Sequence, residues 1–593
     1  MFLKKLPRHK NGKDHVYWAL AESYRTPRGP RNRVVAYLGE LQAHERKGWA
    51  RLASKLDGHP PAVVQRTLFA EEPAGEPVPE NVTVRVGGVR VEGTTDFGDL
   101  WLALALWHAL GLDVLFRELL PRGREAVEWA LVVTILVVAR FCEPSSERQI
   151  EQTWYPRTSL PELLGVRREQ VYVQRLYRGL DVLVPHKEAV ERHLKGRLGE
   201  LFDLDYELVI YDITSTYFEG EARKNPQAKR GYSRDKRPGS KQVCIALVVT
   251  TDGVPVGYEV FDGNRRDVTT IEEIVEAMER KYGKAKRIWA LDRGMVSEEN
   301  LRFLRKRKGH YIVGTPRSDL RHYERELTEG GWTAVYEDLE VKLCPSPDGQ
   351  ESFVLCRSVA RAAKERAIHE RFSKRIEEGL GKLRDRLARA NKRPNRSQVE
   401  RQIGRLLQRN SRAAGKYHVE VRDDPERRGH LCVGWTSRED WSQWATVSEG
   451  VYLLRTNLVG WEPETLWKTY IQLTDVEAAF RTIKSDLVIR PIHHQVPRRV
   501  HAHILVAFLS YAMWKTLQKW MEAAGLGRGV ATVLKELARI KCSEVILPTN
   551  TGREIQLRCV TRPDKWQETL LERLRLEIPP RLGHPKWRNL TEA

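Results

Sequence analysis

The pattern of apolar and polar residues changes twice along the chain. Over residues 96–200 apolar side chains recur at three- and four-residue intervals, as at Leu100, Leu104 and Trp107, which predicts a helical region. From residue 207 short apolar runs predict strands, in the order strand, strand, strand, helix, strand, helix, strand. The run 241–261 has a DG turn between two strands, a strong hairpin signal. This part of the chain therefore predicts an α/β domain.

Residues 321–449 interrupt the α/β pattern. Their flanks predict strands and their centre predicts a helical hairpin. Ile376, Leu380 and Leu383 follow a heptad, the sequence NKRPN interrupts it, and Val399 and Ile403 resume it. We therefore expect an inserted domain with two packed helices at its centre.

The two ends of the chain have their own patterns. Near the N-terminus two strand-like runs flank the turn TPRGPR, which predicts a hairpin, and another short hairpin is expected at 82–91. After the insertion one long helix is expected from Glu464 to about Leu487, and a second over 498–522. The expected domains are a basic hairpin and helix (1–57), a linker (58–81), a helical domain for DNA binding or dimerisation (82–204), the first part of the core (205–320), the insertion (321–449), the second part of the core (450–525) and a C-terminal domain (526–593).

The charge of the chain favours a polyanionic partner. With 100 Lys and Arg against 79 Asp and Glu, the formal net charge is +21. Residues 1–34 have nine basic and two acidic side chains, and residues 361–420 have 18 and seven, so most of the excess lies in two segments. Nucleic acid is the first candidate partner. The 17 Trp, 19 Tyr and 13 Phe argue against a disordered chain.

Other classes of protein do not fit the composition. The most apolar runs, 130–139 and 504–514, are about half the ~20 residues that a membrane helix needs, so no membrane partner is expected. The N-terminus lacks the apolar stretch of a signal peptide. The seven Cys are scattered without a CxxC pair, which favours a reducing cytoplasm over a disulfide frame or a zinc ribbon.

Two aspartates end predicted strands. Asp212 lies in YDITST and Asp292 in ALDRG. A carboxylate at such a position either caps the following turn or holds a hard metal ion, and each aspartate alone leaves both interpretations open. Two of them in one mixed sheet favour the metal.

A third acid lies on the long predicted helix. With 100° per residue, Tyr470, Leu473, Glu477, Arg481 and Lys484 share one face, which presents an aromatic ring, an acid and two bases. A simple salt bridge between Glu477 and Arg481 is the alternative interpretation.

The order YDIT, LDRG and Y-x2-L-x3-E-x6-K resembles the DDE transposases of bacterial insertion sequences, within the group that carries the YREK signature, the fourth insertion-sequence family and its relatives. The segments GNRRDVTT, GVYLLRTN and IRPIHH add weaker matches, and the resemblance covers about 205–525. One residue departs from the signature: its Arg is Leu473 here, and Arg481 is a candidate substitute.

The resemblance implies a ribonuclease H-like core, interrupted by the β-rich and helical insertion, with Asp212, Asp292 and Glu477 as catalytic and metal-binding residues. The metal would be two Mg²⁺ ions, with Mn²⁺ as a substitute, because in-line displacement at phosphorus is promoted by two such ions and these prefer carboxylates. Tyr470 and Lys484 would hold phosphates near the cut.

Further residues are candidates for contact with DNA. Arg293 follows the second aspartate and either contacts a phosphate or pairs with an acid, and His494 near Arg490 is expected to face DNA. The basic hairpin 360–412 is either a phosphate-binding arm or a solvated coiled coil. Relatives stack an aromatic side chain of the insertion on a flipped base, and four tryptophans qualify here: Trp332, Trp435, Trp441 and Trp444.

The function implied is that of a cut-and-paste DNA transposase in the bacterial or archaeal cytoplasm, associated with the nucleoid. It would bind the terminal inverted repeats of its element as a homodimer, cleave with a hairpin intermediate and transfer the strands into target DNA. Two alternatives are a metal-dependent nuclease that does not transfer strands and a non-catalytic DNA-binding protein descended from a transposase.

Overall fold

The computed structural model describes the backbone of residues 2–39 except 11, 12, 27 and 28, and residues 76–588 except 124, 205, 207, 284–286, 347 and 348. The described chain forms two compact units. The first contains Met1–Arg266, Glu273–Ala285 and Thr474–Ala593, and the second contains Asp267–Glu272 and Lys286–Leu473. The helix expected before residue 57 and most of the expected linker 58–81 lie outside the described residues.

The N-terminal segment is an antiparallel sheet of three strands: β1 (Phe2–Lys10), β2 (Lys13–Thr26) and β3 (Gly29–Gly39). The hairpin of β2 and β3 is the one that the sequence predicts. Strand β1 was not predicted, because its sequence FLKKLPRHK has more basic than apolar residues.

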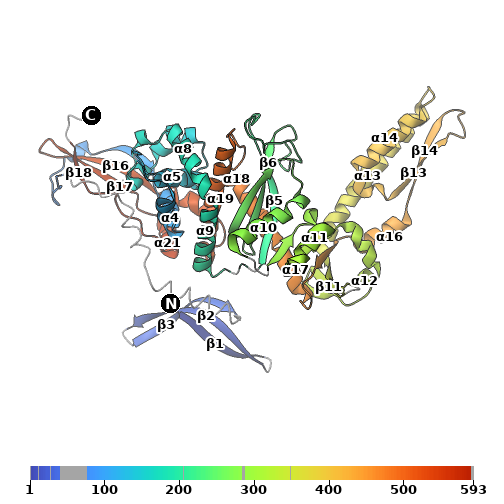
Figure 1. The fold of residues 1–593 in the computed structure, drawn as a ribbon, viewed down its shortest axis with the longest axis horizontal. Coiled ribbons are helices and arrows are strands. Elements are labelled where there is room, and N and C mark those ends of the chain that lie inside the picture. Colours follow the sequence, from blue (N-terminus) through green and yellow to red (C-terminus); the bar gives the residue numbers. More distant parts are fainter. Residues whose placement is uncertain are drawn as a thin grey trace. The chain divides into compact units, whose positions relative to one another are not determined.

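Helices form most of the remaining first unit (Figure 1). The central one is α19, whose residues from Val500 to Leu517 are almost all buried. A helix that is apolar on all sides must be surrounded, and α3, α5, α8 and α9 pack on it together with strand β7. The bounds are α3 (Gly98–Ala109), α4 (Leu112–Leu119), α5 (Trp129–Cys142), α6 (Glu147–Gln149), α7 (Leu160–Leu164), α8 (Val173–Leu183), α9 (Lys187–Phe202), α10 (Ile271–Tyr282), α18 (Leu473–Ser485) and α19 (Pro497–Ala523).

Two groups of antiparallel strands complete the first unit. One contains β5 (Leu208–Tyr217), β6 (Gln242–Thr250) and β7 (Pro255–Asp262), in which β6 and β7 form the predicted hairpin. The other has the order β18-β17-β16-β4. Its elements are β4 (Arg90–Asp96), β16 (Lys541–Pro548), β17 (Glu554–Val560) and β18 (Lys586–Arg588), with α20 (Val530–Leu537) and α21 (Lys565–Leu574) nearby in the chain.

The local hairpin expected at 82–91 is wrong. Strand β4 pairs instead with β16, about 450 residues later in the chain, and residues Val86–Gly88 form a 3-10 turn. The sequence VTVRVGGVRV carries a turn signal, but the partner that satisfies the backbone of β4 comes from the C-terminal segment.

The second unit is built on six strands in the order β10-β11-β12-β15-β9-β8. Only β8 and β9 run parallel among these pairs, so the sheet is mixed as expected. The bounds are β8 (Ile288–Leu291), α11 (Glu298–Lys306), β9 (His310–Gly314), α12 (Glu324–Thr328), β10 (Thr333–Tyr336), β11 (Leu339–Pro345), β12 (Ser352–Ser358), α16 (Glu439–Ser448), β15 (Val451–Thr456) and α17 (Pro463–Ile471).

The predicted helical hairpin is confirmed. Helices α13 (Val359–Arg389) and α14 (Arg396–Arg409) lie side by side, followed by the short α15 (Ser411–Ala414), and the strands β13 (Tyr417–Asp423) and β14 (Leu431–Ser437) run along them (Figure 1). The heptad residues Ile376, Leu380 and Leu383 are buried against Val399 and Ile403. We call α13, α14, β13 and β14 the arm.

Among the described residues no single helix is long and apolar enough to cross a membrane, although two bent helix pairs, at 98–119 and 129–157, pass the same test of length and composition. All seven cysteines are free thiols, as expected.

Candidate active site

Asp212 lies within a strand and not at its end. Strand β5 continues to Tyr217, because Thr214, Ser215 and Thr216 are buried against the sheet and extend its pairing with β6. Asp212 is half-buried between two buried neighbours, and its Oδ1 accepts a hydrogen bond of 2.7 Å from the backbone N–H of Ile213. This contact fixes the direction of the carboxylate. The expectation of a strand-end position is therefore corrected.

Asp292 does follow the end of a strand. All four residues of β8 are buried, Asp292 is exposed, and the backbone turns at once because Met295 N–H donates to the Asp292 carbonyl at 3.0 Å. Its carboxylate makes no ion pair or hydrogen bond with any residue that the structure describes.

A second acid, Asp267, lies close to Asp292. A Cβ atom on Gly294 would sit 3.8 Å from Asp292 Oδ2 and 4.0 Å from Asp267 Oδ2. The absence of a side chain at Gly294 therefore leaves space next to two carboxylates in the second unit. Oxygen ligands around an open space suit a hard cation such as Mg²⁺.

The long helix expected from Glu464 to Leu487 is interrupted. Helix α17 ends at Ile471 and α18 begins at Leu473, and the boundary between the two units follows directly. Gln472 keeps right-handed helical angles (φ −63°, ψ −11°), so the backbone deviates only locally. The expected common face holds for Leu473, Glu477, Arg481 and Lys484 within α18, while Tyr470 belongs to α17.

The two faces of α18 differ as the helical spacing predicts. Glu477 and Arg481 are exposed, and neither side chain makes an ion pair or hydrogen bond within the described part of the chain. Asp475 lies on the other side, where its Cβ and carbonyl are each 3.6 Å from the position of a Cβ on Gly253. Burial raises the pKa of Asp475, and nearby Lys515 opposes that rise. Glu477 is therefore the acid that this helix presents to solvent.

Lys484 and Arg490 converge on an acid that the sequence did not single out. Lys484 Nζ lies 3.1 Å from Asp235 Oδ1, and Arg490 pairs with the same oxygen. The Asp235 side chain is only 4% exposed. Burial lowers the pKa of Lys484, and the charge of Asp235 opposes this effect. Asp235 lies in the loop between β5 and β6, far from α18 in the chain.

His494 does not face DNA as expected. It is buried, its Nε2 lies 3.2 Å from Glu147 Oε1, and its ring meets those of Tyr177 and His503 edge-on. The neighbouring polar residues in the sequence suggested an exposed loop, but packing against the helical domain encloses this side chain. His494 is a structural residue of the first unit.

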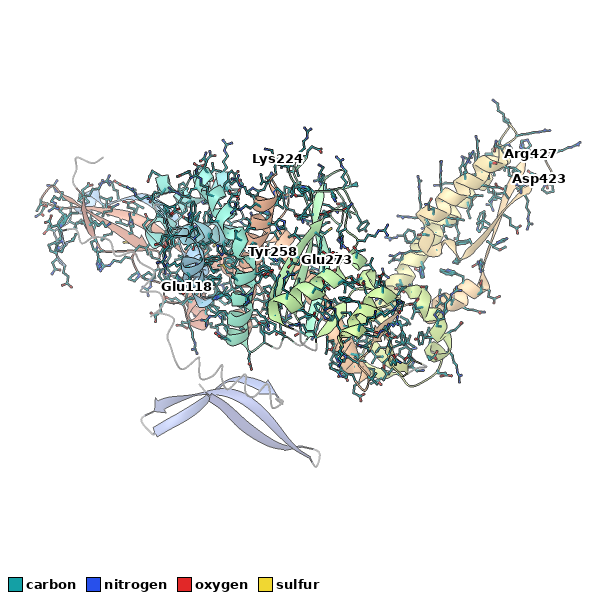
Figure 2. All side chains as sticks on the ribbon, in the orientation of Figure 1. Glu118, Lys224, Tyr258, Glu273, Asp423 and Arg427 are labelled. Carbon is teal, nitrogen blue, oxygen red and sulfur yellow. The ribbon has the colours of Figure 1, made fainter. Side chains whose placement is uncertain are left out.

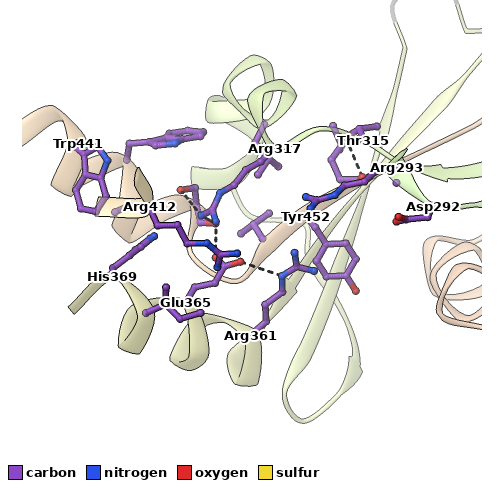
Figure 3. Close-up of a pocket in the computed structure, with 18 of the residues that line it drawn as sticks. Asp292, Arg293, Thr315, Arg317, Arg361, Glu365, His369, Arg412, Trp441 and Tyr452 are labelled. Atoms are coloured by element: carbon purple, nitrogen blue, oxygen red, sulfur yellow. Dashed lines mark hydrogen bonds and ion pairs between the residues drawn. The ribbon is translucent and has the colours of Figure 1, made fainter. Parts of the chain in front are cut away.

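A pocket of about 650 Å³ in the second unit brings several predicted residues together (Figure 3). Asp292, Arg293 and Tyr470 line it. A Cβ on Gly314 would lie 2.5 Å from the Tyr470 hydroxyl, so this glycine permits the close approach of the phenol to β9. Burial, followed by the charge of Asp292, raises the pKa of Tyr470, which keeps the phenol protonated as a hydrogen-bond donor.

The rest of the pocket wall is basic and aromatic. Glu365 accepts hydrogen bonds from Arg317 at 3.0 Å and from Arg361 at 3.3 Å. Its carboxylate therefore partly neutralises the charge of these two pocket arginines. Arg293 and Arg412 also line it and make no ion pair with a residue that the structure describes. The pocket therefore has a net positive wall, which suits a phosphate group.

The four candidate tryptophans have different surroundings, and only two of them line the pocket. Trp332 stacks under Arg357 at 4.3 Å, and Trp435 lies 5.3 Å from Arg384 and packs on the arm's core. Trp441 and Trp444 line the pocket, and the Trp441 ring meets His369 edge-on at 5.3 Å (Figure 3). Only these two of the four line the pocket that Asp292 also lines.

Much of the arm's positive charge is exposed. Some cations pair with acids, such as Arg396 with Glu400 at 3.2 Å, but Arg401, Arg405 and Arg409 on α14 make no ion pair with described residues. Figure 2 shows side chains projecting from both arm helices and Arg427 near the far end. Such a surface can follow a phosphate backbone.

No three His, Cys, Asp or Glu side chains in the described part of the chain are grouped closely enough to hold a metal ion. Asp212 and Glu477 belong to the first unit and Asp292 to the second. Each of the three is exposed or half-buried, and each carries the oxygen ligands that Mg²⁺ prefers.

Comparison with known families gives two matches. The model of the transposase DDE domain matches residues 203–513, more than half of the chain, and the model of the IS1634 family transposase N-terminal domain matches residues 3–60. No curated protein matches the chain. Among solved structures, the chain is similar to the piggyBac transposase synaptic complex with hairpin DNA, with 9% identity, a TM-score of 0.35, and coverage of 75% of this chain and 81% of that chain.

Proposed function

The chain belongs to the DDE transposases of insertion sequences, and we propose that it binds the terminal inverted repeats of its element, cleaves the element ends and joins them to target DNA. The observation that carries this proposal is the arrangement around Asp292: a free carboxylate at a strand end, directly beside a pocket walled by arginines and aromatic rings. Metal-assisted cleavage of DNA needs both acids that bind the metal and groups that hold the phosphate.

We propose Asp212, Asp292 and Glu477 as the metal-binding and catalytic residues, on a ribonuclease H-like core. Two Mg²⁺ ions, or Mn²⁺ in their place, would supply activation of the attacking oxygen and stabilisation of the leaving oxygen. The donor set supports this choice, since all three residues offer carboxylate oxygens and the space at Gly294 adjoins two acids.

The chain's own residues would hold the DNA at the cut. Tyr470 donates its hydroxyl to a phosphate oxygen, and Arg293 contributes charge from the same pocket. On α18, Arg481 is exposed and can take the position of the missing signature arginine, while Lys484 and Arg490 form a second cationic pair. These contacts orient the scissile phosphate without a covalent bond between protein and DNA.

Hairpin formation at the element end needs a place for an unpaired base. We propose that the pocket takes that nucleotide, with Trp441 or Trp444 stacked on the base and Arg412 on its phosphate. Aromatic stacking holds a base irrespective of its identity. This arrangement supports our proposal of a cut-and-paste reaction through a hairpin, in which a homodimer would pair the ends.

Sequence-independent affinity would come from the basic surfaces. The arm exposes arginines along α14, and the N-terminal 34 residues carry nine basic side chains. Their phosphate contacts would add to recognition of the end sequence by the N-terminal and helical regions.

The test is in-vitro excision from a plasmid that carries the gene with its flanking DNA. Asp212→Asn and Glu477→Gln should each reduce cleavage to background while DNA binding stays close to wild type, because the amides keep the shape and remove the ligand charge. Asp475→Asn is the matched control, since it removes an acid from the opposite face of the same helix, and it should keep most activity. An active Glu477→Gln and an inactive Asp475→Asn would refute the assignment.

The products of the same excision reaction distinguish a transposase from the two alternative functions. Cleaved ends without joined products would indicate a nuclease, and binding without cleavage in either Mg²⁺ or Mn²⁺ would indicate a DNA-binding protein only. Joined products from the wild-type chain would establish strand transfer.

A further inference from the structure

The loop between β5 and β6, residues 218–241, is strongly basic but contains one buried acid. It has eight Lys or Arg and three acidic residues. Two of the acids, Glu219 and Glu221, are exposed, whereas the side chain of Asp235 is 4% exposed. In Figure 2, Lys224 of this loop points away from the strands. A buried acid in a basic surface loop calls for a specific partner.

The partners of Asp235 are the two cations that are expected to meet DNA. Lys484 Nζ and Arg490 both contact the same oxygen, Oδ1, with Lys484 at 3.1 Å. The cations themselves are recessed, with side chains 12% and 29% exposed. Asp235 therefore occupies a recessed site formed by two cations.

Only one of the two carboxylate oxygens of Asp235 has a partner in this site. Its second oxygen, Oδ2, is buried and has no hydrogen-bond partner within the described residues. A buried polar atom without a partner destabilises the folded state. A phosphodiester has two unesterified oxygens and could offer a separate acceptor to each cation, so it fits the pair better than Asp235 does.

The loop has a fixed base and a locally bonded tip. At the base, Lys229 and Gln242 exchange backbone hydrogen bonds of 3.0 and 3.1 Å, and Gln242 Nε2 donates to the Tyr232 carbonyl at 3.1 Å. At the tip, the backbone N–H of Arg237 bonds to Ser233 Oγ at 3.0 Å. A tip held by its own turn can move without unpairing β5 from β6.

We propose that Asp235 is an intramolecular substitute for a DNA phosphate: it fills the Lys484–Arg490 site in the DNA-free protein and is displaced when a phosphodiester enters. This inference rests on the proposed function of Lys484 and Arg490. The displacement makes DNA compete with the loop, so the apparent affinity is the intrinsic affinity multiplied by the fraction of molecules whose site is already open. The loop then moves outward with its basic side chains, which become available to the same DNA.

The test is Asp235→Asn, measured as binding to a random-sequence duplex oligonucleotide at fixed salt, because phosphate contacts do not depend on sequence. The variant should bind on the order of tenfold more tightly than wild type, as expected if about a tenth of wild-type sites are open. Asp252→Asn is the matched control. It removes the same charge from an exposed acid that pairs with Lys519 at 2.8 Å, and it should change binding little.

A double variant tests whether the increase in DNA affinity depends on Lys484. In a Lys484→Gln background, Asp235→Asn should give a smaller increase in affinity, because only Arg490 remains to receive the phosphate. Circular dichroism checks that each variant folds. If the amide variant does not fold, Asp235→Ser removes the same charge in a smaller polar side chain and is expected to show the same gain.

Two results would overturn the inference. Binding by Asp235→Asn equal to or weaker than wild type would show that Asp235 positions the cations in the DNA-bound state, and an equal gain with Asp252→Asn would show a general charge effect. End cleavage by the wild-type chain is measured separately. If that cleavage occurs and Asp235→Asn gives no gain, only this inference fails, and if no cleavage occurs the proposed function fails.

Discussion

The surroundings of His503 determine how the folding stability of the protein should depend on pH. The imidazole lies on α19 and is 6% exposed. Its Nε2 donates to the Ile489 carbonyl at 2.9 Å, and its Nδ1 lies 3.4 Å from an Arg140 guanidinium nitrogen. Arg140 also donates to the Val488 carbonyl at 2.8 Å. Protonation of His503 would place a hydrogen and a charge directly opposite the guanidinium.

The pH dependence has a definite sign. Burial, followed by the charge of Arg140, lowers the pKa of His503 from 6.5 to about 3. The unfolded chain then takes up the proton more readily than the folded chain, so the stabilising effect is complete above pH 6.5 and declines as the pH falls toward 3. One pH unit corresponds to about 1.4 kcal/mol, so lowering the pH from 6.5 to 5 should cost about 2 kcal/mol of folding stability from this residue.

Two other groups with lowered pKa values, Glu147 and His501, do not alter this comparison. Hydrogen bonding to His494 holds the pKa of Glu147 at about 2 despite its burial, so Glu147 loses its contribution only below about pH 4.5. Burial also lowers the pKa of His501, and this effect is the same in wild type and in a His503 variant.

The assay is chemical unfolding of wild type and His503→Gln, followed by tryptophan fluorescence at several pH values. Glutamine retains an N–H donor for the Ile489 carbonyl and has no titrating group. It should be less stable than wild type at pH 7, but its loss between pH 6.5 and 5 should be smaller by about 2 kcal/mol. Parallel curves for the two proteins would refute the argument.

Three further outcomes are expected. Deletion of 361–412 should weaken DNA binding and flatten its salt dependence, because fewer counterions are released, and an unchanged slope would make the arm a structural coiled coil. Trp441→Ala should lower hairpin formation more than DNA binding, whereas Trp332→Ala, outside the pocket, should not; equal losses would argue against stacking there. Arg140→Gln should lower the unfolding free energy by about 2–4 kcal/mol, because buried carbonyls lose their charged donor; denaturation within error of wild type would contradict this.

The sequence alone predicted most of the elements of this protein. Helical spacing and strand patterning are local, so the hairpin of β6 and β7 and the arm helices follow from residues close together in the chain. Helical spacing also accounts for the different surroundings of Glu477 and Asp475 on α18, since a helix fixes the relative directions of its own side chains. The motif order also identified the DDE transposase family, which the family model confirms.

The tertiary structure decided which distant residues meet. Strand β4 follows a turn signal but pairs with β16, and His494 has polar neighbours in His493 and Gln495 but is buried against Glu147. Asp235 has no feature in the sequence that marks it, and it acquires its importance only because the fold brings it to Lys484 and Arg490, about 250 residues later in the chain. Local periodicity determines whether one segment forms a helix or a strand. The burial of a charged side chain and the pairing of a strand depend on which other segments pack against it. That packing depends on the whole chain.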